Sequence, residues 1–327
     1  MTDPAPLLSI PEAEAPANGG AAWFQGRDGA RLRAALFHPD GPPRGSAVLS
    51  PGRTEPIEKY FEVVRELQAR GFVVLVHDWR GHGLSVRMTS DPMKGHTSGW
   101  RVFIRDFKAL LGTYEAQLPK PWIALSHSMG AGLTLLALVE GEDRFEGAVF
   151  TSPMLTVNVR PIPPAVGRGL CAAMVRVGRD ESYVLAQGPN LVDQPFESNI
   201  LTHDRGRWDR MQAQLHASPE LQLGGVTWGW LNFAMGIGGR IAGRASEIRI
   251  PMTLIAAGDE RLCDNGAVRA LAARASDARY VEIPGAFHEL LMETDDVRAK
   301  VWAEFDALAD RVAPRPQASA SASRSSA

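Results

Sequence analysis

The chain has 327 residues, of which 45% are hydrophobic and 22% are charged, a balance typical of a globular protein with a substantial core. Its 35 basic and 37 acidic residues give a formal net charge of -2, so no excess of either sign predicts binding to nucleic acid. The two cysteines, Cys171 and Cys263, are too few for a disulfide framework or a four-ligand zinc site.

Both ends of the chain have a composition that predicts no packed element. Residues 1–21 are rich in Ala, Pro and Glu, and residues 314–327 contain mainly Pro, Gln, Ala, Ser and Arg, so we expect both segments to be disordered. The N-terminus lacks the basic start and apolar stretch of a signal peptide, and no run approaches the roughly 18 apolar residues of a spanning helix. Together with the low cysteine count, these features predict a cytoplasmic protein.

Strands and helices alternate through the first part of the predicted core, residues 22–152. A hairpin is predicted around the turn pair Asp28-Gly29, because runs of strand-forming residues flank it. The expected elements then follow in the order strand 46–50, helix 60–70, strand 72–76, a helix containing 103–111, strand 122–125, a helix from 129, and strand 148–150. This alternation predicts an α/β fold with a mostly parallel sheet flanked by helices.

An insertion interrupts this pattern. After residue 150 the alternation resumes only with the strand predicted at 252–257, a gap far longer than an ordinary connection. We expect residues 153–247 to form a helical subdomain above the carboxyl ends of the strands, where ligands bind in such folds. Residues 248–313 then complete the core with a strand at 280–283 and a closing helix.

The stretch Leu125-Ser126-His127-Ser128-Met129-Gly130 lies between an apolar strand and a helix. A nucleophile elbow needs this context, because a sharp strand-to-helix turn raises the serine hydroxyl above the sheet and small flanking residues avoid collisions. Ser126 occupies the position where the G-x-S-x-G pattern has glycine. We therefore predict that Ser128 is a catalytic nucleophile.

A serine nucleophile needs a histidine base, and chain order selects His288. In folds with a nucleophile elbow the catalytic residues follow one another in the order Ser, acid, His. Only three histidines follow Ser128. Of these, His203 and His216 fall inside the insertion. His288 follows a predicted strand and a short loop, a suitable position for a base that reaches back over the sheet.

The acid should follow the strand at 252–257, in the loop Gly258-Asp259-Glu260-Arg261-Leu262. Spacing alone does not separate Asp259 from Glu260, since either carboxylate could orient an imidazole. Asp264 is a weaker alternative, better explained as a turn or helix-cap residue.

Two backbone N–H groups are expected to stabilise the oxyanion, those of Met129 and Arg53. Met129 follows the nucleophile, and Arg53 lies in the loop after the early strand at 46–50. For the Arg53 side chain the sequence leaves two interpretations open, contact with a substrate phosphate or an ion pair with Glu55 or Glu58.

Two other motifs fail on inspection. His288-Glu289-Leu290-Leu291-Met292 begins like the zinc-protease helix H-E-x-x-H, but methionine replaces the second histidine. Gly130-Ala131-Gly132 follows a strand, yet Leu135 stands where a dinucleotide-binding motif has Gly or Ala. We therefore predict neither a metal nor another cofactor.

The sequence resembles the lysophospholipase and monoacylglycerol lipase group of α/β-hydrolases over residues 22–312. The likeness is carried by five segments: residues 50–60 at the oxyanion loop, Asp78-Trp79-Arg80-Gly81-His82-Gly83-Leu84-Ser85, the elbow, Arg261-Leu262-Cys263-Asp264 and Gly285-Ala286-Phe287-His288. The resemblance implies the α/β-hydrolase fold and places the acid at Glu260, where an aspartate is commoner in the family. This departure keeps Asp259 as the alternative acid.

The resemblance also implies a function. It predicts a carboxylic ester hydrolase that cleaves single-chain lipid esters through an acyl-enzyme on Ser128, with the insertion as a lid that makes transient contact with a membrane surface. The lid residues Trp228, Trp230 and Phe233 are expected to bind the acyl chain, with packing inside the lid as the competing interpretation. Cys263 resembles a thiol near the triad of some relatives.

Two other functions stay open at this stage. An aminopeptidase would use the same core and triad but needs lid acids that hold the substrate amine, for which Glu181, Asp193 and Glu197 are available. A hydrolase-like scaffold that senses a small ligand without turnover is the second alternative. The complete set of triad candidates argues against it.

Overall fold

One central sheet organises the molecule. The structure is a computed structural model that describes residues 3–159, 161–189, 192 and 194–315. Within these residues the sheet has nine strands: β1 (Asp3–Ala5), β2 (Gly19–Gln25), β3 (Arg31–Phe37), β4 (Gly45–Ser50), β5 (Phe72–His77), β6 (Trp122–His127), β7 (Gly147–Thr151), β8 (Met252–Ala257) and β9 (Ala278–Ile283). Their spatial order is β1-β2-β3-β5-β4-β6-β7-β8-β9, antiparallel from β1 to β5 and parallel from β5 to β9. The predicted mostly parallel sheet is therefore confirmed.

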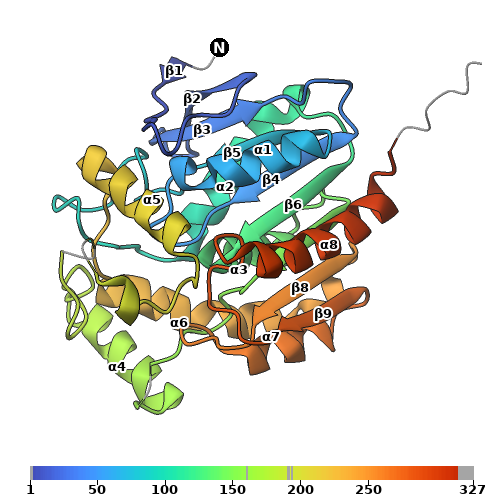
Figure 1. The fold of residues 1–327 in the computed structure, drawn as a ribbon. Helices are drawn as coiled ribbons and strands as arrows, with labels where there is room; N and C mark the ends of the chain where they lie inside the picture. Colours follow the sequence, from blue (N-terminus) through green and yellow to red (C-terminus); the bar gives the residue numbers. More distant parts are fainter. Residues whose placement is uncertain (1–2, 160, 190–191, 193, 316–327) are drawn as a thin grey trace, which may run out of the picture.

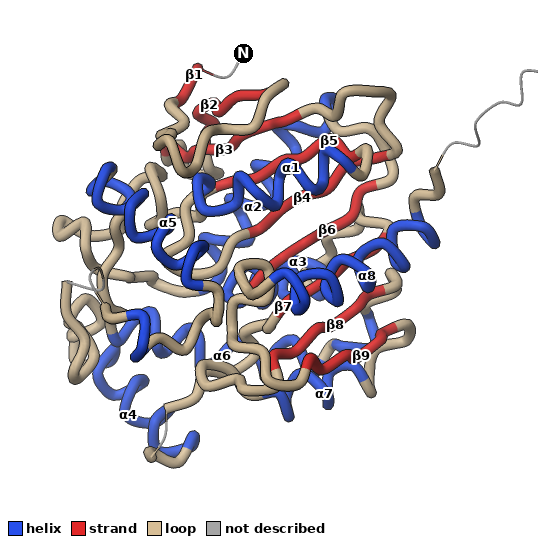
Figure 2. The backbone as a smooth tube through the Cα atoms, viewed as in Figure 1, coloured by secondary structure: helices blue, strands red, loops and turns tan. Residues whose placement is uncertain are grey.

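Helices cover both faces of this sheet, with α1 and α8 in front and α2, α3 and α7 behind in Figures 1 and 2. The α-helices are α1 (Phe61–Ala69), α2 (Trp100–Tyr114), α3 (Ser128–Val139), α4 (Pro164–Arg176), α5 (Arg205–Ala217), α6 (Trp228–Gly243), α7 (Asn265–Ala272) and α8 (Asp295–Val312). Short 3-10 helices are η1 (Ile57–Tyr60), η2 (Glu115–Gln117), η3 (Phe196–Ser198), η4 (Pro219–Leu221) and η5 (Ala245–Glu247). None of these helices is both long and apolar enough to cross a lipid bilayer.

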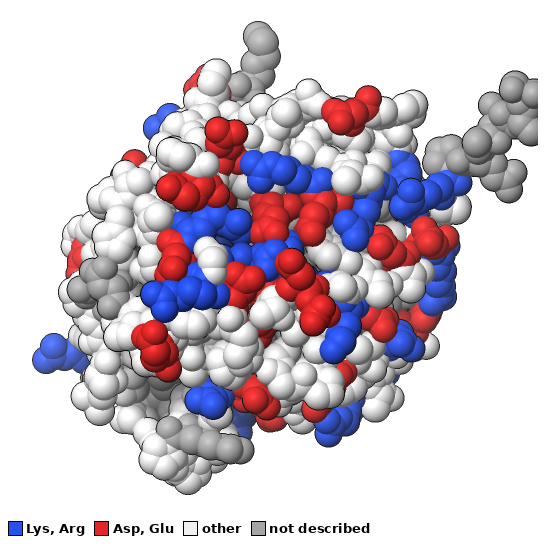
Figure 3. Space-filling view, viewed as in Figure 1, with Lys and Arg blue, Asp and Glu red and all other residues white. Residues whose placement is uncertain are grey.

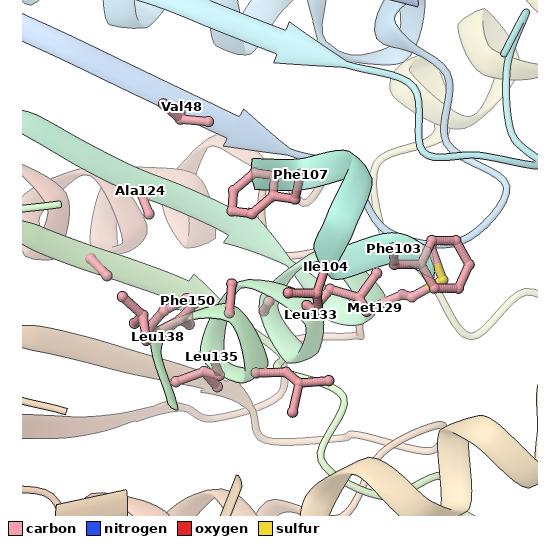
Figure 4. Packing of buried hydrophobic residues seen from close by; sticks show 14 of the residues in the cluster. Val48, Phe103, Ile104, Phe107, Ala124, Met129, Leu133, Leu135, Leu138 and Phe150 are labelled. Carbon is pink, nitrogen blue, oxygen red and sulfur yellow. The ribbon is translucent and has the colours of Figure 1, made fainter. Parts of the chain in front are cut away.

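The continuous apolar runs of the strands follow from this layering. In β5, Val73 and Leu75 point into the cluster shared with α2 and α3, whereas Val74 and Val76 point into the cluster shared with α1 and α8. Successive side chains of a strand alternate between faces, so a strand buried on both faces is apolar at every position. Figure 4 shows the first cluster, where Phe107 of α2 lies beside the strands.

The segment predicted as a lid, residues 153–247, is helical and carries α4, α5 and α6. α4 packs on α6, and α6 in turn packs on α3 of the core. Phe233 and Ile237 of α6 belong to the same buried cluster as Phe103 of α2. One face of α6 is therefore part of the main core rather than of a separate subdomain.

The N-terminal segment differs from its prediction. Residues 3–21 were expected to be disordered, but β1 pairs antiparallel with β2, and the backbone beyond β1 is held by buried polar side chains. The buried Arg33 guanidinium donates to the Pro6 carbonyl at 3.0 Å, and Glu58 Oε1 accepts from the Leu8 N–H at 3.1 Å. This segment is therefore held by contacts that buried side chains make with its backbone. Such contacts do not require a regular spacing of hydrophobic residues, so no sign of them is visible in the sequence. Of the predicted C-terminal tail, residues 316–327 lie outside the described part of the chain.

Charged side chains of both signs gather over α1, α5 and α8, on the face shown in Figure 3. Glu62 of α1 accepts from Arg207 of α5 at 2.6 Å and from Arg298 of α8 at 2.7 Å. Arg207 also bonds to Asp204 at 2.6 Å. This network ties α5, a helix of the segment 153–247, to two helices of the core.

Candidate active site

Ser128 lies at a strained turn between β6 and α3. It is the first residue of α3, directly after the last residue of β6, and its φ is +49°, a conformation that non-glycine residues rarely adopt. A Cβ at Gly130 would lie 2.3 Å from the carbonyl oxygens of Ser50 and of Pro51, so only glycine fits this close approach. The buried Ser126 hydroxyl lies 3.1 Å from the Thr134 hydroxyl, which provides a polar partner for the serine that replaces the motif glycine.

His288 connects Ser128 with Glu260. Its Nε2 lies 2.8 Å from Ser128 Oγ, and its Nδ1 lies 2.7 Å from Glu260 Oε2. A carboxylate only accepts hydrogen bonds, so the protonated Nδ1 donates a hydrogen bond to Glu260. Nε2 is then free to accept a hydrogen bond from the serine hydroxyl. The backbone of His288 is held as well, because Ser152 Oγ donates to its carbonyl oxygen at 2.6 Å.

The electrostatics of this chain suit a general base. Burial lowers the pKa of His288, but the hydrogen bond and the charge of Glu260 outweigh burial and raise that pKa above its ordinary value. Burial likewise raises the pKa of Glu260, and the contact with His288 and the backbone N–H groups of Leu262 and Cys263 lower it overall. Glu260 is therefore ionised at neutral pH, which favours the imidazolium form of His288.

The two other acids have different surroundings. Asp259, the alternative acid, has an exposed side chain, and its neighbour Glu260 makes the contact with His288. Asp264 caps α7, accepting from the Gly266 N–H at 2.8 Å, as its helix-cap interpretation predicts.

The two predicted oxyanion donors belong to two segments that both line the cavity over Ser128. Met129 is in the first turn of α3, where backbone N–H groups have no acceptor within the helix. Arg53 lies in the loop after β4, and the motif segment 78–85 anchors this loop through two hydrogen bonds. Asp78 Oδ1 accepts from the Ile57 N–H at 3.0 Å, and Trp79 Nε1 donates to the Pro51 carbonyl at 2.8 Å.

A buried ionic cluster beside His288 was not predicted from the sequence. Lys59 Nζ donates to Glu55 Oε1 at 2.7 Å and to Glu289 Oε1 at 2.6 Å, and Tyr60 donates to Glu55 Oε2 at 2.7 Å. The His127 ring centroid is 4.9 Å from that of His288, and burial lowers the pKa of His127 to about 4. The four-residue spacing of Glu55 and Lys59 was the available signal, although Glu289 is close only in the folded chain.

A cavity of about 640 Å³ opens over Ser128 and His288, between the strand ends and the lid segment. Trp230, one of the three aromatic residues expected to bind the acyl chain, lines it. The prediction is wrong for Trp228, which packs against Cys171 and Met235, and for Phe233, which packs in the main core. The competing interpretation, packing inside the lid segment, describes Trp228, whereas Phe233 packs against Phe103 of the core helix α2.

Among the described residues, one group of side chains has metal-ligating atoms close together: those of Glu260, Cys263 and His288 lie within 4.8 Å of one another. Two of the three residues already bond to each other. Burial, with the charges of Glu260 and Asp264, raises the pKa of Cys263 well above its ordinary value, so the sulfur is a thiol rather than the thiolate that metals bind. The arrangement fits proton transfer better than metal binding.

Comparison with known proteins places this arrangement in a family. The chain is 30% identical to lysophospholipase L2 of Escherichia coli strain K12, over 85% of this chain and 84% of that protein. It is 26% identical to a monoacylglycerol lipase of Mycolicibacterium smegmatis, over 83% of this chain and 91% of that one. The solved structure of a thermostable carboxyl esterase from Bacillus coagulans matches the fold with a TM-score of 0.72 at 16% identity, covering 91% of this chain and 99% of the esterase.

A family model described as serine aminopeptidase, S33, matches residues 41–295, which include the elbow, the Glu260 loop and His288. The match covers most of the chain, and the sheet and helices are those of an α/β-hydrolase. The chain therefore belongs to the serine aminopeptidase S33 family of α/β-hydrolases.

Proposed function

We propose that the protein is a serine esterase that hydrolyses carboxylic esters of single-chain lipids, with Ser128 as nucleophile, His288 as general base and Glu260 as the acid that orients it. The observation that carries the proposal is the unbroken chain of contacts from Ser128 Oγ through His288 to Glu260, at 2.8 and 2.7 Å. Both distances are within the range of a working base and its orienting carboxylate.

The reaction follows from this geometry. Ser128 Oγ attacks the ester carbonyl carbon while His288 Nε2 takes the hydroxyl proton, and the N–H groups of Met129 and Arg53 stabilise the negative charge on the carbonyl oxygen. The intermediate collapses to an acyl-enzyme as His288 returns the proton to the leaving alcohol. Water, deprotonated by the same nitrogen, then attacks the acyl-enzyme and releases the fatty acid.

Two features support a single-chain lipid ester as the substrate. The cavity beside Ser128 is of a size that encloses a small organic ligand, and much of its lining is apolar, including Val157, Val184, Leu223, Val226 and Leu262. The relatives that share about 30% and 26% identity carry the names lysophospholipase and monoacylglycerol lipase.

The family description raises the alternative of an aminopeptidase, which needs a free carboxylate for the substrate amine. Glu181 and Glu197 are exposed and do not line the cavity, and Asp193 lies outside the described residues. Of the described carboxylates that do line it, Glu55 and Glu289 share the ammonium group of Lys59. These contacts favour the esterase.

We also propose that the lid touches a membrane surface when the substrate is taken up. α4 carries Val166 and Leu170, which are 59% and 39% exposed, and Val177 follows its last turn at 69% exposed. Their spacing of four and seven residues puts them along one side of the helix. Such a stripe is typical of a helix that lies in a lipid interface.

Labelling with a fluorophosphonate probe tests the function. We expect the wild-type protein to be labelled and to hydrolyse p-nitrophenyl acyl esters, and Ser128→Ala to lose the label and roughly a million-fold in turnover. Turnover of aminoacyl nitroanilides instead of esters would support the aminopeptidase. A wild-type protein that is neither labelled nor active would support the ligand-sensing scaffold.

A further inference from the structure

The Arg53 side chain is a cation that lines the cavity without a carboxylate partner. Its Nη1 donates to the Gly224 carbonyl at 2.8 Å, and no carboxylate of the described residues lies within 4.0 Å of its guanidinium. The sequence had offered Glu55 and Glu58 as partners. Glu55 is instead bonded to Lys59, and both oxygens of Glu58 accept from Arg33 at 2.7 Å.

The other cations that line the cavity are neutralised. Lys59 lies between two glutamates, and Arg207 bonds to Glu62, Asp204 and Asp295. Within the described part of the chain, Arg53 is therefore the cavity cation whose charge remains available to a ligand. Burial without an opposite charge lowers the pKa of Arg53 to about 10, but the group stays protonated at neutral pH.

A buried donor without an acceptor among the described residues lies beside Arg53. The Arg53 guanidinium carbon is 5.6 Å from the ring centroid of Trp230, which also lines the cavity and is 6% exposed. The buried Trp230 Nε1 has no hydrogen-bond acceptor among the described residues. Trp230 belongs to the first turn of α6, the positive end of that helix dipole. Guanidinium, indole N–H and helix end all favour an anion at this place.

We propose that the Arg53 side chain binds the phosphate of a lysophospholipid head group and makes the enzyme prefer lysophospholipids to neutral monoacylglycerols. This inference rests on the proposed function, because it assigns the head group of that substrate. In a lysophospholipid, glycerol carbons separate the ester from the phosphate. Arg53 has a matching arrangement: its backbone N–H is the proposed donor to the ester oxyanion, and the methylene groups of its side chain separate that N–H from the guanidinium proposed for the phosphate.

The test compares 1-palmitoyl lysophosphatidylcholine with 1-palmitoylglycerol in the same detergent micelles. A hydrogen bond to a charged group stabilises a complex by about 1.5–3 kcal/mol. We therefore expect Arg53→Gln to lower the ratio of the two kcat/KM values, lysophospholipid over monoacylglycerol, by roughly 10- to 100-fold. Arg53→Lys, which keeps the charge, should retain part of the ratio. If the substitution also disturbs the oxyanion loop, it lowers kcat/KM for both substrates by the same factor, and this factor cancels in the ratio.

Arg87 provides the matched control. Its Nη2 donates to the carbonyls of Glu220 and Gln222, so it anchors the same segment as the Arg53 bond to Gly224, but it does not line the cavity. We expect Arg87→Gln to leave the ratio at the wild-type value. An equal drop in this control would overturn the proposal, since the position of the segment would then explain the effect.

An Arg53→Gln ratio equal to that of the wild type would also overturn the proposal. If inhibition by palmitate is weaker in that variant, the ligand of Arg53 is the carboxylate of the product. A wild-type protein that hydrolyses neither ester would instead contradict the proposed function.

Discussion

His288 can accept the Ser128 proton only while its Nε2 is unprotonated, so the pKa of His288 sets the acid limit of the proposed reaction. Burial lowers this pKa, and the bond to Glu260 raises it by more. The pKa therefore lies above the ordinary value of about 6.5, and activity should fall as the pH drops through that higher value. Glu260 makes the imidazolium more stable while limiting the base to neutral and alkaline conditions.

Replacing the acid should separate these two effects. In Glu260→Gln the charge is lost and burial remains, so we expect the acid limb of kcat/KM to move to lower pH while the maximal rate falls roughly 10⁴-fold. The measurement is kcat/KM for a p-nitrophenyl ester between pH 5 and 9. An acid limb that stays at the wild-type pH in this variant would show that another group controls it.

Asp259→Asn is the control for this experiment, because it removes a carboxylate from the adjacent, exposed position. Its rate and its acid limb should match those of the wild type. A loss of activity in Asp259→Asn comparable to that of Glu260→Gln would contradict the assignment of the acid.

Chain order and local context were enough to predict which serine and histidine lie together, since the fold fixes both relative to the sheet. They did not separate Asp259 from Glu260, because adjacent residues of a loop point in different directions that only the folded backbone determines. The predicted substrate contacts of the three aromatic residues on α6 also depend on the folded backbone. Trp228, Trp230 and Phe233 share one helix, but of the three only Trp230 lines the cavity.

At the scale of elements, α4 packs on α6 with one side and exposes apolar side chains on another. Val166, Leu170 and Val177 would be buried if this side of the helix entered the interface of a micelle or vesicle. Burial of apolar area contributes about 25 cal/mol per Å², so three such side chains would add substantially to membrane binding. Their contribution to the folded state in water is small because they contact solvent.

The triple variant Val166→Ser, Leu170→Ser and Val177→Ser should therefore lower activity on lipid presented in vesicles several-fold, without lowering activity on dissolved p-nitrophenyl butyrate. Vesicle co-sedimentation measures the binding step directly. Val86→Ser, which replaces a 41% exposed valine far from α4 in the sequence, is the control. Equal loss on both substrates would mean that the stripe supports the fold or the cavity instead of a membrane contact.

Helices and strands with a recognisable pattern of hydrophobic residues could be predicted from the sequence, and those without such a pattern could not. Strand β5 is a continuous apolar run and helix α8 has apolar residues at helical spacing, as their burial requires. β1 contains two polar or proline positions in three residues and is held by pairing with β2, so its sequence carried no strand pattern. α7 has only eight residues, and its cap Asp264 was the one signal that preceded it.

At the scale of the whole molecule, buried histidines whose pKa is lowered make the fold sensitive to acid. Burial lowers the pKa of His77 and of His82 to about 3 and that of His127 to about 4. In the unfolded chain each would titrate near 6.5. Below that pH the unfolded chain binds protons that the folded chain does not, so these residues reduce stability progressively as the pH falls from 6.5 toward 4. His288, with its raised pKa, contributes in the opposite sense.

We expect the free energy of unfolding to fall steeply between pH 6.5 and 5, by between about 1 and 2 kcal/mol for each of these three histidines. Urea unfolding at several pH values measures this slope. His77→Gln removes one titrating group, so its stability should depend less steeply on pH than that of the wild type, whatever the variant costs at pH 7. His38→Gln, at an exposed position, should keep the wild-type slope. If the stability of the wild type does not change with pH in this range, the histidines do not control acid unfolding. Carboxylates such as Glu55 would then control it at lower pH, since the pKa of Glu55 in the folded chain is about 2.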